Sequence, residues 1–145
     1  MAVRKPFEFL EHISDAFVAA HGSTLEEAFE NAALAMFGVM TNTSTVQPRD
    51  KDNLNVEAED IYSLLYTWLE QLLIKFEVTG FVYSKFKLDK IEKTPKGYRL
   101  TATIFGEPFN PEKHPSKTAI KAVTYHQMEI AEDQKGITVK VLFDI

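Results

Sequence analysis

Two stretches of the chain carry apolar residues at the spacing of an amphipathic helix. The first opens at Ser23 and Thr24, each followed three residues later by a glutamate, which is the pattern of a helix capping box. The second covers about residues 59–76 and precedes Gly80, a residue type that often ends helices. Each apolar stripe is narrow enough to be covered by a sheet, so we expect core helices rather than membrane or partner-binding helices.

Most of the remaining chain alternates between apolar and polar residues, as half-buried strands do. The element order is two strands, a helix, a strand, a helix and four strands, and Pro48 suits an edge strand. This order predicts a single α+β domain over residues 1–145, with two helices packed on a largely antiparallel or mixed β-sheet. The predicted strands are residues 6–11, 16–20, 46–56, 81–92, 98–105, 119–130 and 137–143.

Composition narrows the class of protein. The 145 residues are 45% apolar and 26% charged, as in ordinary globular domains, and contain no apolar run long enough to span a membrane. The N-terminus lacks a signal-peptide pattern and there is no cysteine, so we expect a cytoplasmic protein. The net charge of −5 argues against direct, tight binding of nucleic acid.

The last predicted strand places Asp144 on its polar face, and Phe143 and Ile145 on its apolar face. The sequence ends at Ile145, so the Asp144 side chain and the α-carboxylate of Ile145 lie one residue apart. Two anionic groups this close repel unless a cation lies between them, and hard divalent cations prefer carboxylate oxygens. Asp15 is a third candidate ligand, although it could instead cap backbone amides. The functional alternative to that capping role is a site in which the three carboxylate groups surround one Ca²⁺ or Mg²⁺ ion.

Other chemistry has weaker support. His12, His21, His114 and His126 show no short ligand spacing, which disfavours zinc. His126 falls on the more apolar face of its predicted strand, where a buried core imidazole is the commoner role. Glu107 and His114 share one loop and could act as an acid–base pair, although a structured surface loop is the simpler alternative. The sequence has no G-x-S-x-G elbow, P-loop or G-x-G-x-x-G motif.

Several motifs, in order along essentially the whole chain, resemble the archease family. The family's usual His-Thr-Ala-Asp reads His12-Ile13-Ser14-Asp15 here, which keeps the histidine and the aspartate. The matching motifs are His12-x-x-Asp15, Gly22-x-Thr24-Leu25-Glu26-Glu27-Ala28-Phe29, Leu64-Leu65-x-x-Trp68-Leu69-x-x-Leu72-Leu73, Gly106-Glu107 with His114, Lys121-Ala122-Val123-Thr124-Tyr125-His126, and Asp144-Ile145.

The resemblance implies a non-catalytic protein cofactor. Archeases assist the RtcB-type RNA ligase of tRNA splicing: they promote guanylylation of its active-site histidine, broaden its nucleotide use and restore multiple turnover. The family's cation site carries over to Asp15, Asp144 and the terminal carboxylate of Ile145. The residues that remain as candidates to support this site or to face the ligase are His12, Lys121, His126, Glu107 and His114.

Two other functions stay open at this point. The same carboxylates could serve a free-standing, metal-dependent enzyme that acts on phosphate esters. Alternatively, the chain could be a chaperone-like binding module whose cation is purely structural.

Overall fold

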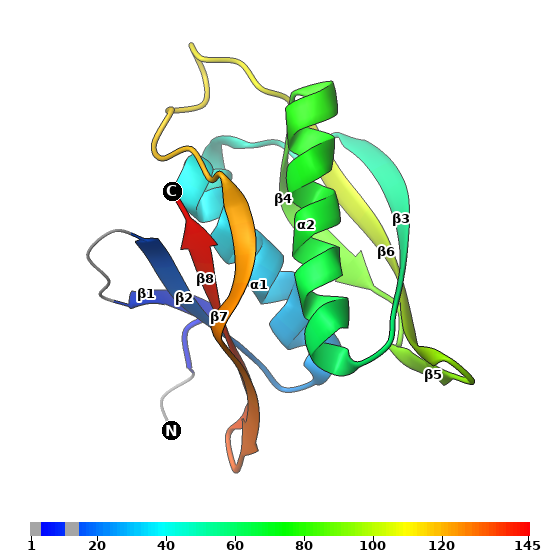
Figure 1. Ribbon diagram of the computed structural model, residues 1–145. Helices are drawn as coiled ribbons and strands as arrows, with labels where there is room; N and C mark the ends of the chain where they lie inside the picture. Colours follow the sequence, from blue (N-terminus) through cyan, green and yellow to red (C-terminus); the bar gives the residue numbers. More distant parts are fainter. Residues whose placement is uncertain (1–3, 11–14) are drawn as a thin grey trace.

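The computed structural model describes residues 4–10 and 15–145 (Figure 1). Its helices are α1 (Leu25–Met40) and α2 (Ile61–Thr79), with a short 3-10 helix, η1 (Thr43–Thr45). Its strands are β1 (Phe7–Leu10), β2 (Asp15–Gly22), β3 (Asp50–Ala58), β4 (Phe81–Leu88), β5 (Glu92–Thr94), β6 (Gly97–Pro108), β7 (Ala122–Asp133) and β8 (Gly136–Asp144).

The strands form two sheets rather than one. The first has the order β1-β2-β8-β7 and the second the order β3-β6-β4, with β5 also paired to β6. Every strand pairing among the described residues is antiparallel, which confirms the predicted α+β class. Each helix contacts strands of both sheets, and Figure 1 shows the two helices lying between them.

The two-sheet arrangement follows from how α1 is buried. Every residue from Ala35 to Met40, in the last turn and a half, is buried, so this end of the helix has no polar face to leave in water. A single sheet covers only one side of a helix; α1 is therefore packed against β2 and β8 on one side and β4 on another. The prediction of a single covering sheet was wrong, because the apolar surface of α1 is wider at this end of the helix than the spacing of its apolar residues suggests.

The helix ends are fixed as the sequence predicts. Thr24 is the N-cap of α1 and accepts a hydrogen bond from Glu27 N at 3.1 Å, while Glu27 accepts one from Ser23 N at 2.8 Å. Asp60 caps α2, and Gly80 ends it in the left-handed conformation, with φ 76°. These contacts satisfy backbone groups that have no partner inside the helix.

Trp68 joins the two helices at the centre of the core. Its side chain is fully buried, and its indole Nε1 donates a hydrogen bond of 3.0 Å to the backbone oxygen of Phe29 in α1. The alanines of α1 are also fully buried, which allows close packing of the neighbouring strands. None of the helices in the described part of the chain is long and apolar enough to cross a membrane.

Several strand boundaries differ from prediction. Residues 46–49 precede β3 rather than belonging to it, residues 119–121 precede β7, and the predicted strand 81–92 is broken into β4 and the start of β5. In each place the backbone hydrogen bonds no longer follow the pairing between strands. Asp89 N, for example, donates a hydrogen bond of 3.0 Å to Thr101 O in a loop contact. The edge position predicted for the strand near Pro48 is confirmed, because β3 ends its sheet.

Candidate functional site

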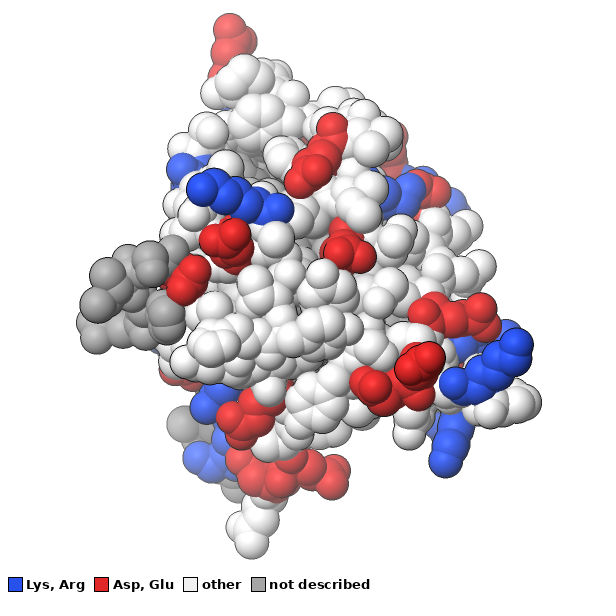
Figure 2. Space-filling model, viewed as in Figure 1, with Lys and Arg blue, Asp and Glu red and all other residues white. Residues whose placement is uncertain are grey.

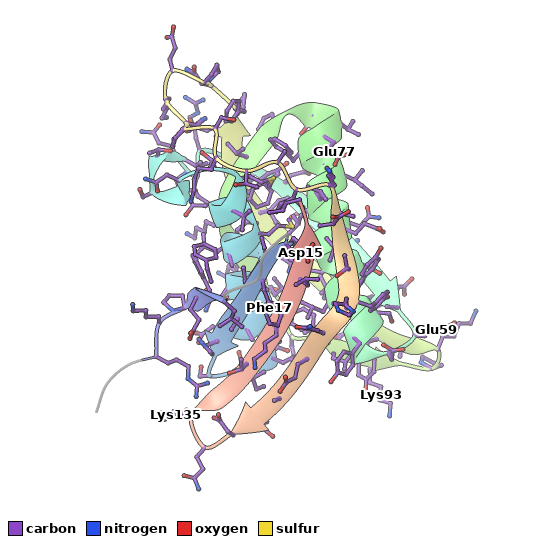
Figure 3. The ribbon with its side chains drawn as sticks, turned by 60° about the vertical axis from the view of Figure 1, so that its left-hand side comes forward. Asp15, Phe17, Glu59, Glu77, Lys93 and Lys135 are labelled. Carbon is purple, nitrogen blue, oxygen red and sulfur yellow. The ribbon has the colours of Figure 1, made fainter. Side chains whose placement is uncertain are left out.

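Asp15 and Asp144 are direct partners across two neighbouring strands. The antiparallel register of β2 and β8 sets the Cα of Asp15 opposite that of Asp144. Residues that are directly opposite project from the same face of a sheet, with Cβ atoms about 4.5–5.5 Å apart. Figure 3 shows Asp15 at the end of the sheet, beside the last residues of β8, with Phe17 further along the same strand. The structure thus brings together two of the predicted ligands that lie 129 positions apart in the sequence.

Strand alternation explains why these carboxylates face outward. Val139, Val141 and Phe143 of β8 are fully buried, so the intervening residues of the strand lie on the opposite face, and Asp144 is exposed. Ile145 is partly buried and packs against the core. The apolar side chains before and after Asp144 therefore hold the end of the chain in place, as the alternation predicts.

Lys121 lies directly beside Asp144. Its backbone N–H donates a hydrogen bond of 2.7 Å to the backbone oxygen of Asp144, and the next residue, Ala122, is the register partner of Asp144 in β7. The Lys121 side chain is exposed. A cationic side chain therefore lies one residue from the register partner of Asp144, directly before β7, the strand that borders β8 on the side opposite β2.

Glu107 and His114 are buried rather than exposed to a partner. The Glu107 Oε2 atom accepts hydrogen bonds from His114 Nε2 at 2.9 Å and from Gln47 N at 2.9 Å, and Lys113 Nζ lies 2.7 Å away. The Nδ1 atom of His114 accepts a hydrogen bond of 2.9 Å from Asn110 N, so the ring proton sits on Nε2, facing the carboxylate. With only 3% of Glu107 and 1% of His114 exposed, the pair can support the site but cannot touch a partner.

The electrostatics of this cluster keep Glu107 ionised. The hydrogen bond from Lys113 lowers the pKa of Glu107 to about 2, and the bonds from Gln47 N and His114 act in the same direction, against the effect of burial. An acid that stays ionised at neutral pH and has three donors around it is unsuited to donate a proton. The alternative of a structured loop, rather than an acid–base pair, fits these contacts.

The loop from Phe109 to Lys121 connects this buried cluster to the aspartates. Beyond His114 it runs past the C-terminal end of α1, where Lys117 Nζ donates to Gly38 O at 2.6 Å and Thr118 N donates to Val39 O at 3.1 Å. It ends at the Lys121–Asp144 contact. Because these contacts hold the loop at both ends and in its middle, they fix the position of Lys121 directly before β7.

The prediction for His126 was wrong, because His126 is exposed rather than on an apolar face. The regular register between β7 and β8 breaks between Thr124 and Glu129, and Gln127 has a φ of 57°. This bulge inserts extra residues, so the simple alternation used for the prediction fails after Thr124. His12 lies outside the described residues.

The set of donors fits a hard cation with oxygen ligands but not zinc. Within residues 4–10 and 15–145, no group of three or more His, Cys, Asp and Glu side chains is placed to hold a metal ion. The paired aspartates supply carboxylate oxygen only, and further ligands have to come from groups such as the carboxylate of Ile145, backbone carbonyls or water. Two directly opposed like charges are destabilising on their own, and a cation between them removes that cost.

Sequence reasoning missed an aromatic cluster on α2 and β7. The rings of Tyr66 and Tyr125 are stacked, with centroids 4.2 Å apart and an interplanar angle of 7°. The spacing of Tyr62, Tyr66 and Glu70, four residues apart in α2, was the available signal. It was unused because these residues lie outside the apolar stripe that defines the helix.

Comparison with known proteins identifies relatives over nearly the whole chain. The Archease protein family (MTH1598/TM1083) matches residues 7–145. The protein archease of Thermococcus kodakarensis is 47% identical over 132 residues, which are 91% of this chain and 92% of that protein. The protein archease of Methanosarcina acetivorans is 42% identical over 141 residues, which are 97% of each chain.

Two solved structures have the same fold. The solution structure of Methanobacterium thermoautotrophicum protein 1598 superposes with a TM-score of 0.83 at 42% identity, over 97% of this chain and 99% of that one. A Thermotoga maritima protein described as an archease and possible chaperone superposes with a TM-score of 0.63 over 100% and 99% of the two chains, and its 20% identity supports the fold alone. None of these four names is that of an enzyme. The family match and the extent of identity together show that this chain belongs to the archease family.

Proposed function

We propose that this protein is a cytoplasmic, non-catalytic activator of an RtcB-type RNA ligase, which promotes guanylylation and multiple turnover of the ligase in tRNA splicing or RNA repair. Family membership supports the class of function. The single observation that carries the mechanism is the direct pairing of Asp15 with Asp144 across β2 and β8, which gathers two carboxylates at one end of a rigid sheet.

In this proposal Asp15, Asp144 and the α-carboxylate of Ile145 hold one divalent cation, with Ca²⁺ favoured over Mg²⁺ or Mn²⁺. When bound, the cation neutralises the carboxylates and adds a fixed positive charge at the tip of the sheet. The β2–β8 pairing sets the two aspartates opposite each other, and the packing of Ile145 against the core supports a role for its α-carboxylate as the third ligand.

Lys121 has a separate role in the proposed contact with the ligase. Its side chain is exposed next to Asp144, where an ammonium group is available to phosphate or carboxylate groups of the ligase–nucleotide complex. Glu107 and His114 act at a distance, since they anchor the loop that leads to Lys121. Direct, tight RNA binding is not part of the proposal, because the net charge is −5.

The test is single-turnover guanylylation of purified, folded ligase with and without this protein. We expect wild-type protein to accelerate the step and Asp144→Asn to lose that effect while its melting temperature stays near the wild-type value. Asp50→Asn, which removes an equal charge from exposed β3 on the other sheet, is the matched control and should activate normally.

Three other outcomes would contradict this mechanism or favour one of the alternative functions. Full stimulation by Asp144→Asn would remove the paired carboxylates from the mechanism. No stimulation of folded ligase by the wild type, combined with improved recovery of ligase refolded in its presence, would favour a chaperone. Turnover of RNA ends or nucleotides by this protein alone would indicate a free-standing enzyme.

A further inference from the structure

A second surface, formed by α2 and β7, exposes aromatic side chains that the proposed cation site does not use. Tyr62 is 40% exposed and Tyr125 is 52% exposed, although large aromatic residues are usually more deeply buried. Tyr66 lies between Tyr62 and the middle of the helix, on the same side of α2, and is half-buried. We call Tyr62, Tyr66 and Tyr125, with the carboxylates of Asp60 and Glu70, the tyrosine surface.

The stacking geometry determines which part of Tyr125 is available. Its ring lies parallel to that of Tyr66, with an interplanar angle of 7° and a centroid separation of 4.2 Å. Tyr66 therefore packs against one face of the Tyr125 ring. The large exposed fraction of Tyr125 comes from the opposite face and the ring edge, so the stack presents one flat aromatic face to solvent.

The backbone of β7 is irregular at Tyr125. The bulge in β7 begins directly before Tyr125, and Gln127 within it has a φ of 57°, the only positive φ of a non-glycine residue in the described chain. Such a conformation is unfavourable and is retained where surrounding contacts impose it, often at functional surfaces. The Tyr62 hydroxyl accepts a 3.3 Å hydrogen bond from Ile130 N, which ties the strand to α2 beyond the bulge.

Carboxylates border the exposed ring. The Tyr66 hydroxyl donates a hydrogen bond of 3.0 Å to Glu70, which raises the pKa of Tyr66. Burial raises the pKa of Tyr125, and the negative charges of Asp60 and Glu70 raise it further. Among the described residues, no Lys or Arg forms an ion pair with Asp60 or Glu70.

The view of Figure 2 includes this face of the molecule. It shows a broad uncharged area edged by Asp and Glu side chains, with the Lys and Arg side chains mostly toward its margins. A flat aromatic face beside carboxylates that form no ion pair with a described Lys or Arg is complementary to a planar cation. It is a poor match for phosphate groups, which these carboxylates repel.

We infer that the tyrosine surface binds an arginine side chain carried by a partner protein. A guanidinium group stacks on the open face of Tyr125, and its N–H groups donate to Glu70 or Asp60 in the fork geometry that matches a carboxylate. The ammonium group of a lysine supplies the positive charge, but it neither stacks on the ring nor donates paired hydrogen bonds to a carboxylate. This inference goes beyond the proposed function, because it concerns a surface other than the Asp15–Asp144 pair and does not require the ligase.

The test is an NMR titration of the ¹⁵N-labelled full chain, followed by its ¹H–¹⁵N signals, with two capped peptides, Gly-Arg-Gly-Arg-Gly and Gly-Lys-Gly-Lys-Gly. We expect the arginine peptide to shift the signals of Tyr66, Tyr125 and Glu70 and to bind more tightly than the lysine peptide. Tyr125→Ala and Glu70→Gln should each weaken arginine binding at least about threefold, the size of an exposed cation–π contact. Tyr125→Phe keeps the ring and should bind nearly as well as the wild type.

Glu112→Gln, an exposed carboxylate in the loop after β6, is the matched control and should bind like the wild type. Because Tyr125 and Glu70 lie at the surface, unchanged spectra elsewhere will show that the variants remain folded. Three results would overturn the inference: no shifts at the tyrosine surface, equal binding of the two peptides, or shifts spread over all exposed carboxylates. Concentration-dependent shifts of these residues without peptide would instead identify a second copy of the chain as the occupant.

Discussion

Replacing Glu107 with alanine should destabilise the protein substantially, although the residue lies far from the paired aspartates in the sequence. The Nε2–H group of His114 then loses its acceptor in a fully buried position, which costs about 1–3 kcal/mol. Gln47 N and Lys113 Nζ lie nearer to solvent and can be rehydrated, so their lost bonds add about 1 kcal/mol together. The expected loss in the free energy of unfolding is about 2–4 kcal/mol.

Urea unfolding followed by fluorescence measures this change directly, because Trp68 is the only tryptophan in the chain and is fully buried. Glu107→Gln keeps a carbonyl acceptor of similar shape and should lose less than Glu107→Ala. Glu112→Ala removes an exposed carboxylate from the loop that follows β6 and is the control, expected within about 0.5 kcal/mol of the wild type. A Glu107→Ala variant as stable as Glu112→Ala would refute the argument that this buried cluster anchors the loop.

The pH dependence gives an independent check on the same group. The folded-state pKa of Glu107 is about 2, below the ordinary value of 4.5. The stabilisation from ionised Glu107 is therefore fully present above about pH 4.5 and is lost as the pH falls toward 2. The stability difference between the wild type and Glu107→Gln should shrink across this interval. A difference that stays constant from pH 6 to about pH 2.5 would contradict the assigned cause.

Two further substitutions test the packing of the fold. In Gly106→Ala the new Cβ atom overlaps the backbone oxygen of Val82, so we expect a loss of about 3 kcal/mol in the free energy of unfolding, measured by heat or urea. In Gly38→Ala the nearest atom is 3.6 Å away, and a helical position gains up to about 1 kcal/mol. Equal effects of the two substitutions would contradict this reasoning. Trp68→Phe removes the hydrogen bond from the indole to the Phe29 carbonyl and also buried volume, so circular dichroism should report a loss of about 2–4 kcal/mol in the free energy of unfolding. A loss below about 1 kcal/mol would show that the indole is unimportant for stability.

The helices and the class of fold were predictable because local chemistry determines them. The capping residue Thr24 and the terminating Gly80 satisfy backbone groups within a few residues of themselves, so sequence spacing is sufficient to find them. The division into two sheets was not predictable in this way. It depends on which strands pair, and on the burial of α1 from two sides, which are properties of the whole fold.

The candidate site was likewise predictable only where local sequence determines it. The outward direction of Asp144 follows from alternation in β8, but its pairing with Asp15 depends on the register between strands distant in the sequence. His126 was misplaced because a single bulge shifts every later residue of the strand. The tyrosine stack was missed because Tyr66 and Tyr125 meet only when α2 packs against β7.

The central claim is that Asp15 and Asp144 jointly bind one divalent cation, and a calcium titration by calorimetry tests it most directly. We expect one Ca²⁺ per chain for the wild type and for Asp50→Asn. We expect affinity weakened by at least about tenfold in both Asp15→Asn and Asp144→Asn, since even changes outside the ligand set can cost that much. A wild-type protein that binds no Ca²⁺, Mg²⁺ or Mn²⁺, or variants that bind as tightly as the wild type, would contradict the central claim.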